Sequence, residues 1–295
     1  MRFALINSGL GLLGTASELN KLRPDADLVI AMDPDGMPWG PRTPEDIAGR
    51  SLALARAAAA YEPDVIIVAC NTGTVHALKA LRDEFEPDIP VVGTVPAIKP
   101  AAAAARTVAI WATVATTQSD YQGRLIAEFG GSAQVTPVAC PGLATAVDAG
   151  DSDAIAIAIA DAASRTPAGC GAVVLGCTEY ELAADLIGSA VPGAILFGTA
   201  AAVAAQALRR TVREPAAVKG RDLKPVSDVP TGTLTVLLSG RYGSLPPAAL
   251  LYRQGRELAR LATGPARTAD LTLTTGPARA AEGALGSVAS DVGAS

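Results

Sequence analysis

Two cysteines of this chain each stand directly after an apolar, β-forming run. Cys70 follows the run IIVA, and Cys177 follows the run VVLG. A thiol at the carboxyl end of a parallel strand lies where open α/β sheets bind ligands, and the N-terminus of a following helix favours a thiolate there. Each thiol could instead be a small buried apolar group. Two matched contexts in one chain favour a functional role for the thiols over this structural one.

Polar residues follow both cysteines at once. Such residues cap helices and hold carboxylates, and here they are Asn71 and Thr72 after the first cysteine and Thr178 after the second. Glu179 comes next, and its carboxylate would raise the pKa of a neighbouring thiol. An acidic side chain is also favoured in the first turn of a helix, so Glu179 could serve only to stabilise that turn.

Short β-rich runs alternate with alanine-rich helical stretches along most of the chain. Strands are predicted at 2–6, 27–31, 65–69, 90–93, 107–112, 134–138, 172–175, 194–197 and 233–238. Helices are predicted at 44–60, 73–85, 119–128, 144–149, 153–163, 179–187, 199–211 and 247–262. Continuous apolar strands between helices indicate parallel sheets covered on both faces, so the fold class is α/β. Segment 212–232 is polar and rich in proline, which is typical of a linker.

Composition excludes several classes of protein. The chain has 295 residues, 49% of them hydrophobic, and a net charge of −5, so there is no electrostatic case for nucleic-acid binding. No apolar run resembles a signal peptide or a membrane span, and a cytoplasmic protein with reduced thiols is expected. The one histidine, His76, is predicted on a helix surface or an interface. No cysteine pair has metal-ligand spacing, so neither a metal nor a cofactor is expected.

A glycine-rich loop follows the first predicted strand. Residues 9–14 read GLGLLG, and Asp33 lies further on, which fits the outline of a dinucleotide-binding fingerprint. The match is weak because Asp33 lies in the turn DPDG and not at the clean end of a strand. Glycines let a backbone approach any anion, and a substrate carboxylate would serve as well as a pyrophosphate. We therefore disfavour nucleotide binding.

These motifs, in this order, resemble the glutamate racemases and, more broadly, the cofactor-independent aspartate/glutamate racemase superfamily. The resemblance covers roughly residues 2–240. It rests on NSGLGL at 7–12, PWG at 38–40, ACNT at 69–72, PVVG at 90–93, Ala112, Thr113 and Thr116, ACP at 139–141 and LGCT at 175–178.

The resemblance implies a fold and a mechanism. The fold would be two pseudo-symmetric three-layer lobes with parallel sheets and the active site between them. Residues 1–97 with 210–263 would form the first lobe and 98–209 the second, while 264–295 would be a poorly ordered tail. The mechanism would be a two-base proton exchange at the α-carbon, because no single side chain reaches both faces of that carbon. Cys70 and Cys177 would be the two bases, without any cofactor.

The resemblance also implies binding residues and a substrate. The α-amino and α-carboxylate groups of a small amino acid would be bound by Ser8, Asn71, Thr72 and Thr178. Its side chain would be surrounded by Pro38, Trp39, Gly40, Thr113 and Thr116. Glutamate is the expected substrate, a homodimer the expected assembly, and supply of D-glutamate for cell-wall synthesis the implied role. Cys140 and Cys170 are predicted to be structural.

Two positions depart from the family pattern. Asn7 stands where glutamate racemases have Asp, and Glu179 where they have His. We predict that Glu179 takes the place of that His as the proton partner of Cys177; the alternative is that it only caps its helix. We predict that Asn7 only orients substrate or Cys70, that Cys70 rests as a thiolate and Cys177 as a thiol, and that Asn7→Asp would raise activity or shift its pH profile. Asp148 could match a family acid that supports the missing histidine.

The departures leave other functions open. One is an aspartate racemase or another amino-acid racemase of the superfamily, since GCTE is a form that resembles aspartate racemases. A second is a catalytically weakened homologue that acts as a ligand-binding protein, which Asn7 favours. A third is a related carbon-acid enzyme, a decarboxylase or a cis–trans isomerase; retention of both cysteines argues against the decarboxylase.

Overall fold

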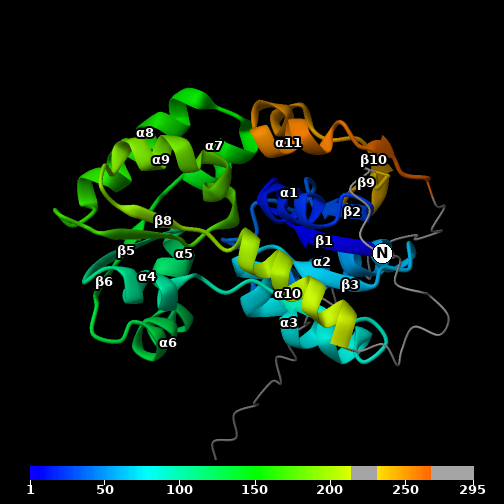
Figure 1. Cartoon of the computed structure of the whole chain (residues 1–295), viewed down its shortest axis with the longest axis horizontal. Helices are drawn as coiled ribbons and strands as arrows, with labels where there is room; N and C mark the ends of the chain where they lie inside the picture. The colour runs from blue at the N-terminus through cyan, green and yellow to red at the C-terminus, as the bar shows by residue number, and fades with distance from the viewer. Residues whose placement is uncertain (214–230, 267–295) are drawn as a thin grey trace, which may run out of the picture.

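Two β-sheets, each covered by helices on both faces, form two lobes that lie side by side (Figure 1). The computed structural model describes residues 1–213 and 231–266. The predicted α/β class is confirmed: the second sheet is entirely parallel, and the first is parallel except at β10.

The first sheet has seven strands in the order β10-β9-β2-β1-β3-β4, with β11 beside β9. Their bounds are β1 Arg2–Asn7, β2 Asp27–Met32, β3 Val65–Val68, β4 Val91–Gly93, β9 Thr233–Leu238, β10 Arg241–Gly243 and β11 Ala262–Thr263. One face packs on α1 (Leu12–Leu22), α10 (Ala200–Arg213) and α11 (Arg253–Leu258), and the other on α2 (Pro44–Ala59) and α3 (Asn71–Phe85). Burial on both faces explains why β1 and β3 are continuous apolar runs.

The second sheet has the order β6-β5-β7-β8. Its strands are β5 Thr107–Ala112, β6 Gln134–Ala139, β7 Ala172–Leu175 and β8 Ile195–Phe197. One face packs on α7 (Leu143–Ala149), α8 (Ser152–Arg165), the 3₁₀ helix η1 (Thr178–Ala183) and α9 (Ala184–Ala190). The other face packs on α4 (Ile98–Ala104) and α6 (Asp120–Phe129), and the short α5 (Val114–Thr117) follows β5.

The lobes are also joined by elements away from the sheet ends. Helix α10 follows β8 of the second sheet but packs against α1, β3 and β4 of the first. Next to α11 and the 3₁₀ helix η2 (Pro247–Leu251), Tyr252 Oη donates a 2.6 Å hydrogen bond to the carbonyl of Val147 in α7. These contacts favour grouping α10 with the first sheet. The lobe limits expected from the sequence, 1–97 with 210–263 and 98–209, are a prediction that these contacts do not test.

The elements expected from the sequence differ from the structure at several places. Helices α1, α4 and α5 were not predicted, α1 because its first residues were interpreted as part of a glycine-rich loop. The helix expected at 179–187 is the 3₁₀ helix η1 followed by α9. The helix expected at 247–262 is the 3₁₀ helix η2 followed by the short α11, whose N-cap is Tyr252. Strands β10 and β11 are too short to show a pattern. Most of the expected linker and tail, 214–230 and 267–295, lies outside the described residues.

Candidate active site

The two thiols lie at equivalent places in the two lobes. Cys70 follows β3 and is the N-cap of α3, and Cys177 follows β7 and is the N-cap of η1. Both strands lie inside their sheets, and both cysteines line one cavity of about 410 Å³. A volume of this order suits a small-molecule ligand.

Most of the residues predicted to form the site line this cavity. They are Ser8, Pro38, Trp39, Gly40, Cys70, Asn71, Thr72, Thr113, Thr116, Cys177 and Glu179. The cavity is also lined by residues that were not predicted as site residues: Pro41, Val114, Ala115, Gln118, Cys140, Pro141, Gly142, Ala144, Thr145, Asp148 and Gly176. The block ACP at 139–141 is the sequence signal for part of this second group, although its Cys140 was predicted to be structural.

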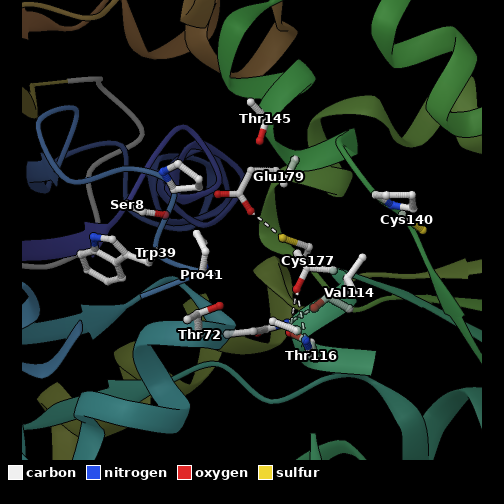
Figure 2. Close-up of a pocket in the computed structure, with 18 of the residues that line it drawn as sticks. Ser8, Trp39, Pro41, Thr72, Val114, Thr116, Cys140, Thr145, Cys177 and Glu179 are labelled. Atoms are coloured by element: carbon white, nitrogen blue, oxygen red, sulfur yellow. Dashed lines mark hydrogen bonds between the residues drawn. The ribbon is translucent and has the colours of Figure 1, made fainter. Parts of the chain in front are cut away.

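Glu179 contacts the second thiol directly. Cys177 Sγ donates a 2.8 Å hydrogen bond to Glu179 Oε2 (Figure 2). The carboxylate also accepts longer hydrogen bonds from Thr178 Oγ1 and from Asn7 Nδ2, both of 3.4 Å. A helix-capping carboxylate would accept from backbone N–H groups, whereas these partners are all side chains. The contacts therefore favour interaction with the thiol over the capping alternative.

Asn7 and Thr178 lie behind the cavity and do not line it. Asn7 is fully buried, and its Nδ2 donates to the carbonyl of Ala69 over 2.8 Å and to Thr178 Oγ1 over 3.3 Å. Thr178 is 3% exposed. The Thr178 hydroxyl belongs to the buried layer that supports Glu179, and the predicted contact of Thr178 with substrate stays a prediction. Asn7, expected to orient substrate or Cys70, lies in the same layer.

The glycine-rich loop lets side chains of the second lobe pack directly against the backbone of the first. A Cβ at Gly9 would lie 2.3 Å from Asp148 Oδ1, and a Cβ at Gly11 would lie 2.3 Å from Thr178 Oγ1 and 2.7 Å from Glu179 Oε1. No side chain fits at either position. The fingerprint-like spacing is thus explained by the approach of two acidic side chains from the second lobe.

Cys70 is held by the first turn of α3. Its Sγ accepts a 3.4 Å hydrogen bond from the backbone N–H of Gly73, and the thiol is 5% exposed. Burial, followed by the negative charge of Glu179, raises the pKa of Cys70 to about 12, and the Gly73 N–H only partly offsets this. The prediction that Cys70 rests as a thiolate is wrong, because loss of hydration outweighs the helix N-terminus.

The pKa of Cys177 is also raised. Burial is the largest cause, followed by the charge of Glu179 and the hydrogen bond to that carboxylate. Both thiols therefore hold their protons at neutral pH, as predicted for Cys177 alone. A base has to be generated at either thiol by a change in its surroundings, and a cation between the two would favour this.

Asp148 is an acid of the cavity that the sequence left uncertain. It lies on α7, and its Oδ1 accepts a 2.7 Å hydrogen bond from the backbone N–H of Leu10 in the first lobe. Burial, followed by the charge of Glu179, raises the pKa of Asp148 to about 8. Asp148 is thus mostly protonated at neutral pH, and the cavity carries less negative charge than its two carboxyl groups suggest.

Basic side chains and metal-ligand clusters do not contribute to this site. Among the described residues that line the cavity there is no Lys, Arg or His, and residues 1–213 and 231–266 contain no cluster of His, Cys, Asp or Glu able to hold a metal ion. His76 is exposed on α3, so its predicted surface position is confirmed. Cys170 lies outside the cavity lining. Cys140 lines the cavity but is 2% exposed, and its Sγ contacts the carbonyl of Val138.

Two sheets that each place a strand-end thiol on one cavity define the class of this protein, a two-lobed α/β protein with a small-molecule cavity between its lobes. The family model described as Asp/Glu/Hydantoin racemase matches residues 7–206, and this chain belongs to that family. The matched region contains both cysteines and every residue that lines the cavity, because the lining residues run from Ser8 to Glu179.

Curated relatives support the same family. The chain is 38% identical over 214 residues to a glutamate racemase of Herpetosiphon aurantiacus, covering 70% of this chain and 82% of that protein. It is 35% identical over 211 residues to a glutamate racemase of Pseudomonas putida, covering 70% and 79%.

Solved structures agree in fold. Escherichia coli glutamate racemase, in complex with L-glutamate and the activator UDP-MurNAc-Ala, superposes with a TM-score of 0.71 at 27% identity, covering 85% of this chain and 91% of that one. Glutamate racemase from Aquifex pyrophilus superposes with a TM-score of 0.61 at 22% identity, which shows the fold alone. The predicted two-lobe arrangement is confirmed. In the part of the chain that the structure describes, no helix is long and apolar enough to cross a membrane.

Proposed function

We propose that this chain interconverts L- and D-glutamate without a cofactor, by proton exchange between Cys70 and Cys177 at the α-carbon. One observation carries the proposal: each lobe places one thiol at the end of an inner strand, and both thiols line the same cavity. The curated relatives named above are glutamate racemases, which supports glutamate as the substrate.

The chemistry is balanced by the two thiols. The thiolate of one cysteine removes the α-proton from one face, and the thiol of the other gives its proton to the opposite face. After turnover the two cysteines have exchanged protonation states, and in the reverse direction they exchange roles. No water is consumed and no electrons are transferred.

Glu179 supplies a route to the thiolate on the second side. The Cys177 proton already points at Glu179 Oε2 over 2.8 Å, so its transfer to that oxygen leaves a thiolate and a neutral carboxylic acid. On the first side, the backbone N–H groups of Gly73, Ser8 and Thr72 lower the pKa of Cys70 against the larger effect of burial. A substrate α-ammonium group near both thiols would favour either thiolate further.

The walls of the cavity suit a zwitterion with an acidic side chain. Asn71 Oδ1 is buried and has no hydrogen-bond partner among the described residues, so it is a suitable acceptor for the ammonium group. Hydroxyl and amide donors of Ser8, Thr72, Thr113 and Thr116 are suitable for the carboxylates. A protonated Asp148 limits repulsion of a substrate that carries two carboxylates.

A second candidate is a weakened homologue that binds amino acids with little turnover. The raised pKa of both thiols favours it, since neither cysteine is a ready base. An aspartate racemase or a racemase for another amino acid remains an alternative substrate class for the same site.

Deuterium wash-in at the α-carbon tests these functions together. The protein is incubated in deuterated water with L- and D-glutamate, L- and D-aspartate and neutral amino acids, and exchange and chirality are followed separately. Racemisation with exchange for glutamate alone supports the proposal. Exchange with aspartate and not with glutamate would assign aspartate as the substrate. Binding of an amino acid without exchange would favour the weakened homologue. Cys170→Ser is a matched control, because that thiol does not line the cavity.

The proposed activity implies a role, a location and an assembly for the protein. Supply of D-glutamate for peptidoglycan is the role that the activity would serve. A cytoplasmic location fits an enzyme with reduced cysteines. A homodimer is the expected assembly, which sedimentation of the purified chain would test.

A further inference from the structure

Asp33 lies outside the cavity, and its buried carboxylate accepts hydrogen bonds from side chains in three segments of the first lobe. It follows β2 and is 4% exposed. Its Oδ2 accepts from Trp39 Nε1 over 2.9 Å and from Arg50 Nη1 in α2 over 3.1 Å. Its Oδ1 accepts from Ser239 Oγ after β9 over 3.1 Å. Because charge-assisted bonds come from three directions, the carboxylate is held in one position.

Ser239 reaches Asp33 from a backbone conformation that is unusual for its type. Its φ is 47°, in the left-handed region that favours glycine. Its N–H donates to the carbonyl of Met32 over 2.7 Å, and its hydroxyl accepts from the backbone N–H of Asp35 over 3.1 Å as well as donating to Asp33. Such a conformation persists only where its surroundings specify it. The turn after β9 is therefore closely fitted to Asp33.

Trp39 connects Asp33 to the first thiol. Its indole is 1% exposed and lines the cavity. A Cβ at Gly73 would lie 3.0 Å from Trp39 Cζ3 and 3.4 Å from Cys70 Cβ, so the indole occupies the space beside Cys70 at the first turn of α3. Trp39 and Cys70 also share one apolar cluster. Figure 2 shows Trp39 between Ser8 and Thr72 on the side of the cavity formed by the first lobe.

We propose that Asp33 is a positioning residue that acts through Trp39: its carboxylate holds the indole against the first turn of α3, and the indole keeps water away from Cys70. The importance of this for catalysis rests on the proposed function, in which Cys70 exchanges a proton with substrate. Burial is the largest cause of the raised pKa of Cys70, so a displaced indole would change the reactivity of this thiol.

Alkylation of the thiols tests the link without requiring racemisation. Wild type, Asp33→Asn and Trp39→Phe are treated with iodoacetamide at one fixed pH, and the modified peptides are measured by mass spectrometry. Cys170, half-buried in the second lobe, is the internal reference. Trp111→Phe is a matched control: Trp111 is also fully buried, its Nε1 donates to Thr166 Oγ1 over 2.8 Å, and it does not line the cavity.

Both variants are expected to raise the alkylation rate of Cys70, relative to Cys170, by about ten-fold, the change that one unit of pKa makes in thiolate content. The control should leave this ratio unchanged. The double variant should not exceed Trp39→Phe, because Asp33 acts only through the indole. Ser239→Ala removes one donor from Asp33 and leaves every cavity side chain intact, so it should give a smaller rise in a well-folded protein.

An unchanged Cys70 rate in Trp39→Phe, Asp33→Asn and Ser239→Ala, with a loss of stability like that of Trp111→Phe, overturns the proposal and leaves Asp33 as a loop anchor. This result is distinct from failure of the proposed function. If wild type shows no α-proton exchange while Cys70 responds as expected, the positioning role stands and the racemase assignment falls. If wild type exchanges the α-proton but the alkylation rate of Cys70 does not change in the variants, the racemase assignment stands and the positioning role falls.

Discussion

Cys177 Sγ lies 2.8 Å from Glu179 Oε2, and the thiol donates its proton to the carboxylate. The two half-sites are therefore chemically unequal. Cys177 has a carboxylate that can take its proton, whereas Cys70 has only backbone N–H donors, foremost that of Gly73. The same carboxylate raises the pKa of both thiols, so it provides a proton acceptor and disfavours free thiolates at once.

Glu179→Gln should lower kcat by about ten-fold or more, in the range usual for a lost acid–base group. The amide keeps the size of the side chain but cannot accept the Cys177 proton as a base. The pKa of Cys177 and that of Cys70 should both fall, because the negative charge that raises them is removed. The pH profile of kcat/KM should accordingly move to lower pH.

Glu181→Gln is the control for that variant. Glu181 is a half-buried neighbour whose Oε1 accepts from the N–H groups of Thr199 and Ala200 at the start of α10, and it does not line the cavity. Its replacement should reduce stability and leave the pH profile unchanged. Equal kinetics of wild type and Glu179→Gln would remove the proton-acceptor role.

Cys70→Ser and Cys177→Ser should each abolish racemisation, because a hydroxyl is far less acidic than a thiol. Each variant should still eliminate from a substrate with a β-leaving group in one enantiomer, since elimination needs mainly one base. The two variants should prefer opposite enantiomers if the thiols act on opposite faces. Racemisation at the wild-type rate by Cys177→Ser would exclude the two-thiol mechanism.

The strand-end thiols and the α/β class were predictable because each depends on a local pattern: a buried parallel strand is a continuous apolar run, and both cysteines end one. The role of Asp148 and the layer of Asn7 and Thr178 behind Glu179 could not be predicted, because both depend on contacts between the two lobes. The N–H of Leu10 meets Asp148 only when the lobes are docked. Helix α1 was missed for a similar reason, since Gly9 and Gly11 are present to admit side chains from the other lobe.

Asp148→Asn should change how stability depends on pH. The pKa of Asp148 is raised in the folded protein from 3.8 to about 8. A raised acid pKa contributes stability that is fully present below the unfolded value and is lost as the pH rises through the folded value. Wild type should therefore lose free energy of unfolding, relative to the variant, between about pH 4 and pH 8.

Urea unfolding of both proteins across that pH range measures this difference. Asp151→Asn is the control, because Asp151 is exposed at the N-cap of α8 and lies away from Glu179. Its difference from wild type should not follow the same pH window. Parallel curves for wild type and Asp148→Asn would mean that Asp148 is ionised in the folded protein at neutral pH.

Asn7→Asp should lower activity, whereas the sequence alone predicted that it would raise activity or shift the pH profile. Asn7 Nδ2 donates to the carbonyl of Ala69 over 2.8 Å and approaches Glu179 Oε1 at 3.4 Å. An ionised carboxyl group in its place would face both of these oxygens without a proton, in a fully buried position. The variant should lose about 2 kcal/mol or more of unfolding free energy, the usual cost of leaving buried polar groups unpaired. Its kcat should fall because Glu179 is displaced from Cys177.

The loss in Asn7→Asp should be smaller at low pH, where protonation of the introduced group restores a donor, and it should grow as the pH rises. The double variant Asn7→Asp/Glu179→Gln identifies the cause, since the introduced carboxylate then faces an amide that can donate to it. Chemical denaturation of the two single variants and the double variant gives the coupling free energy directly. Partial recovery of stability in the double variant would locate the repulsion at Glu179. Full stability together with a raised kcat in Asn7→Asp would instead show that the first half-site accepts an aspartate, and that Asn7 is what limits turnover in this chain.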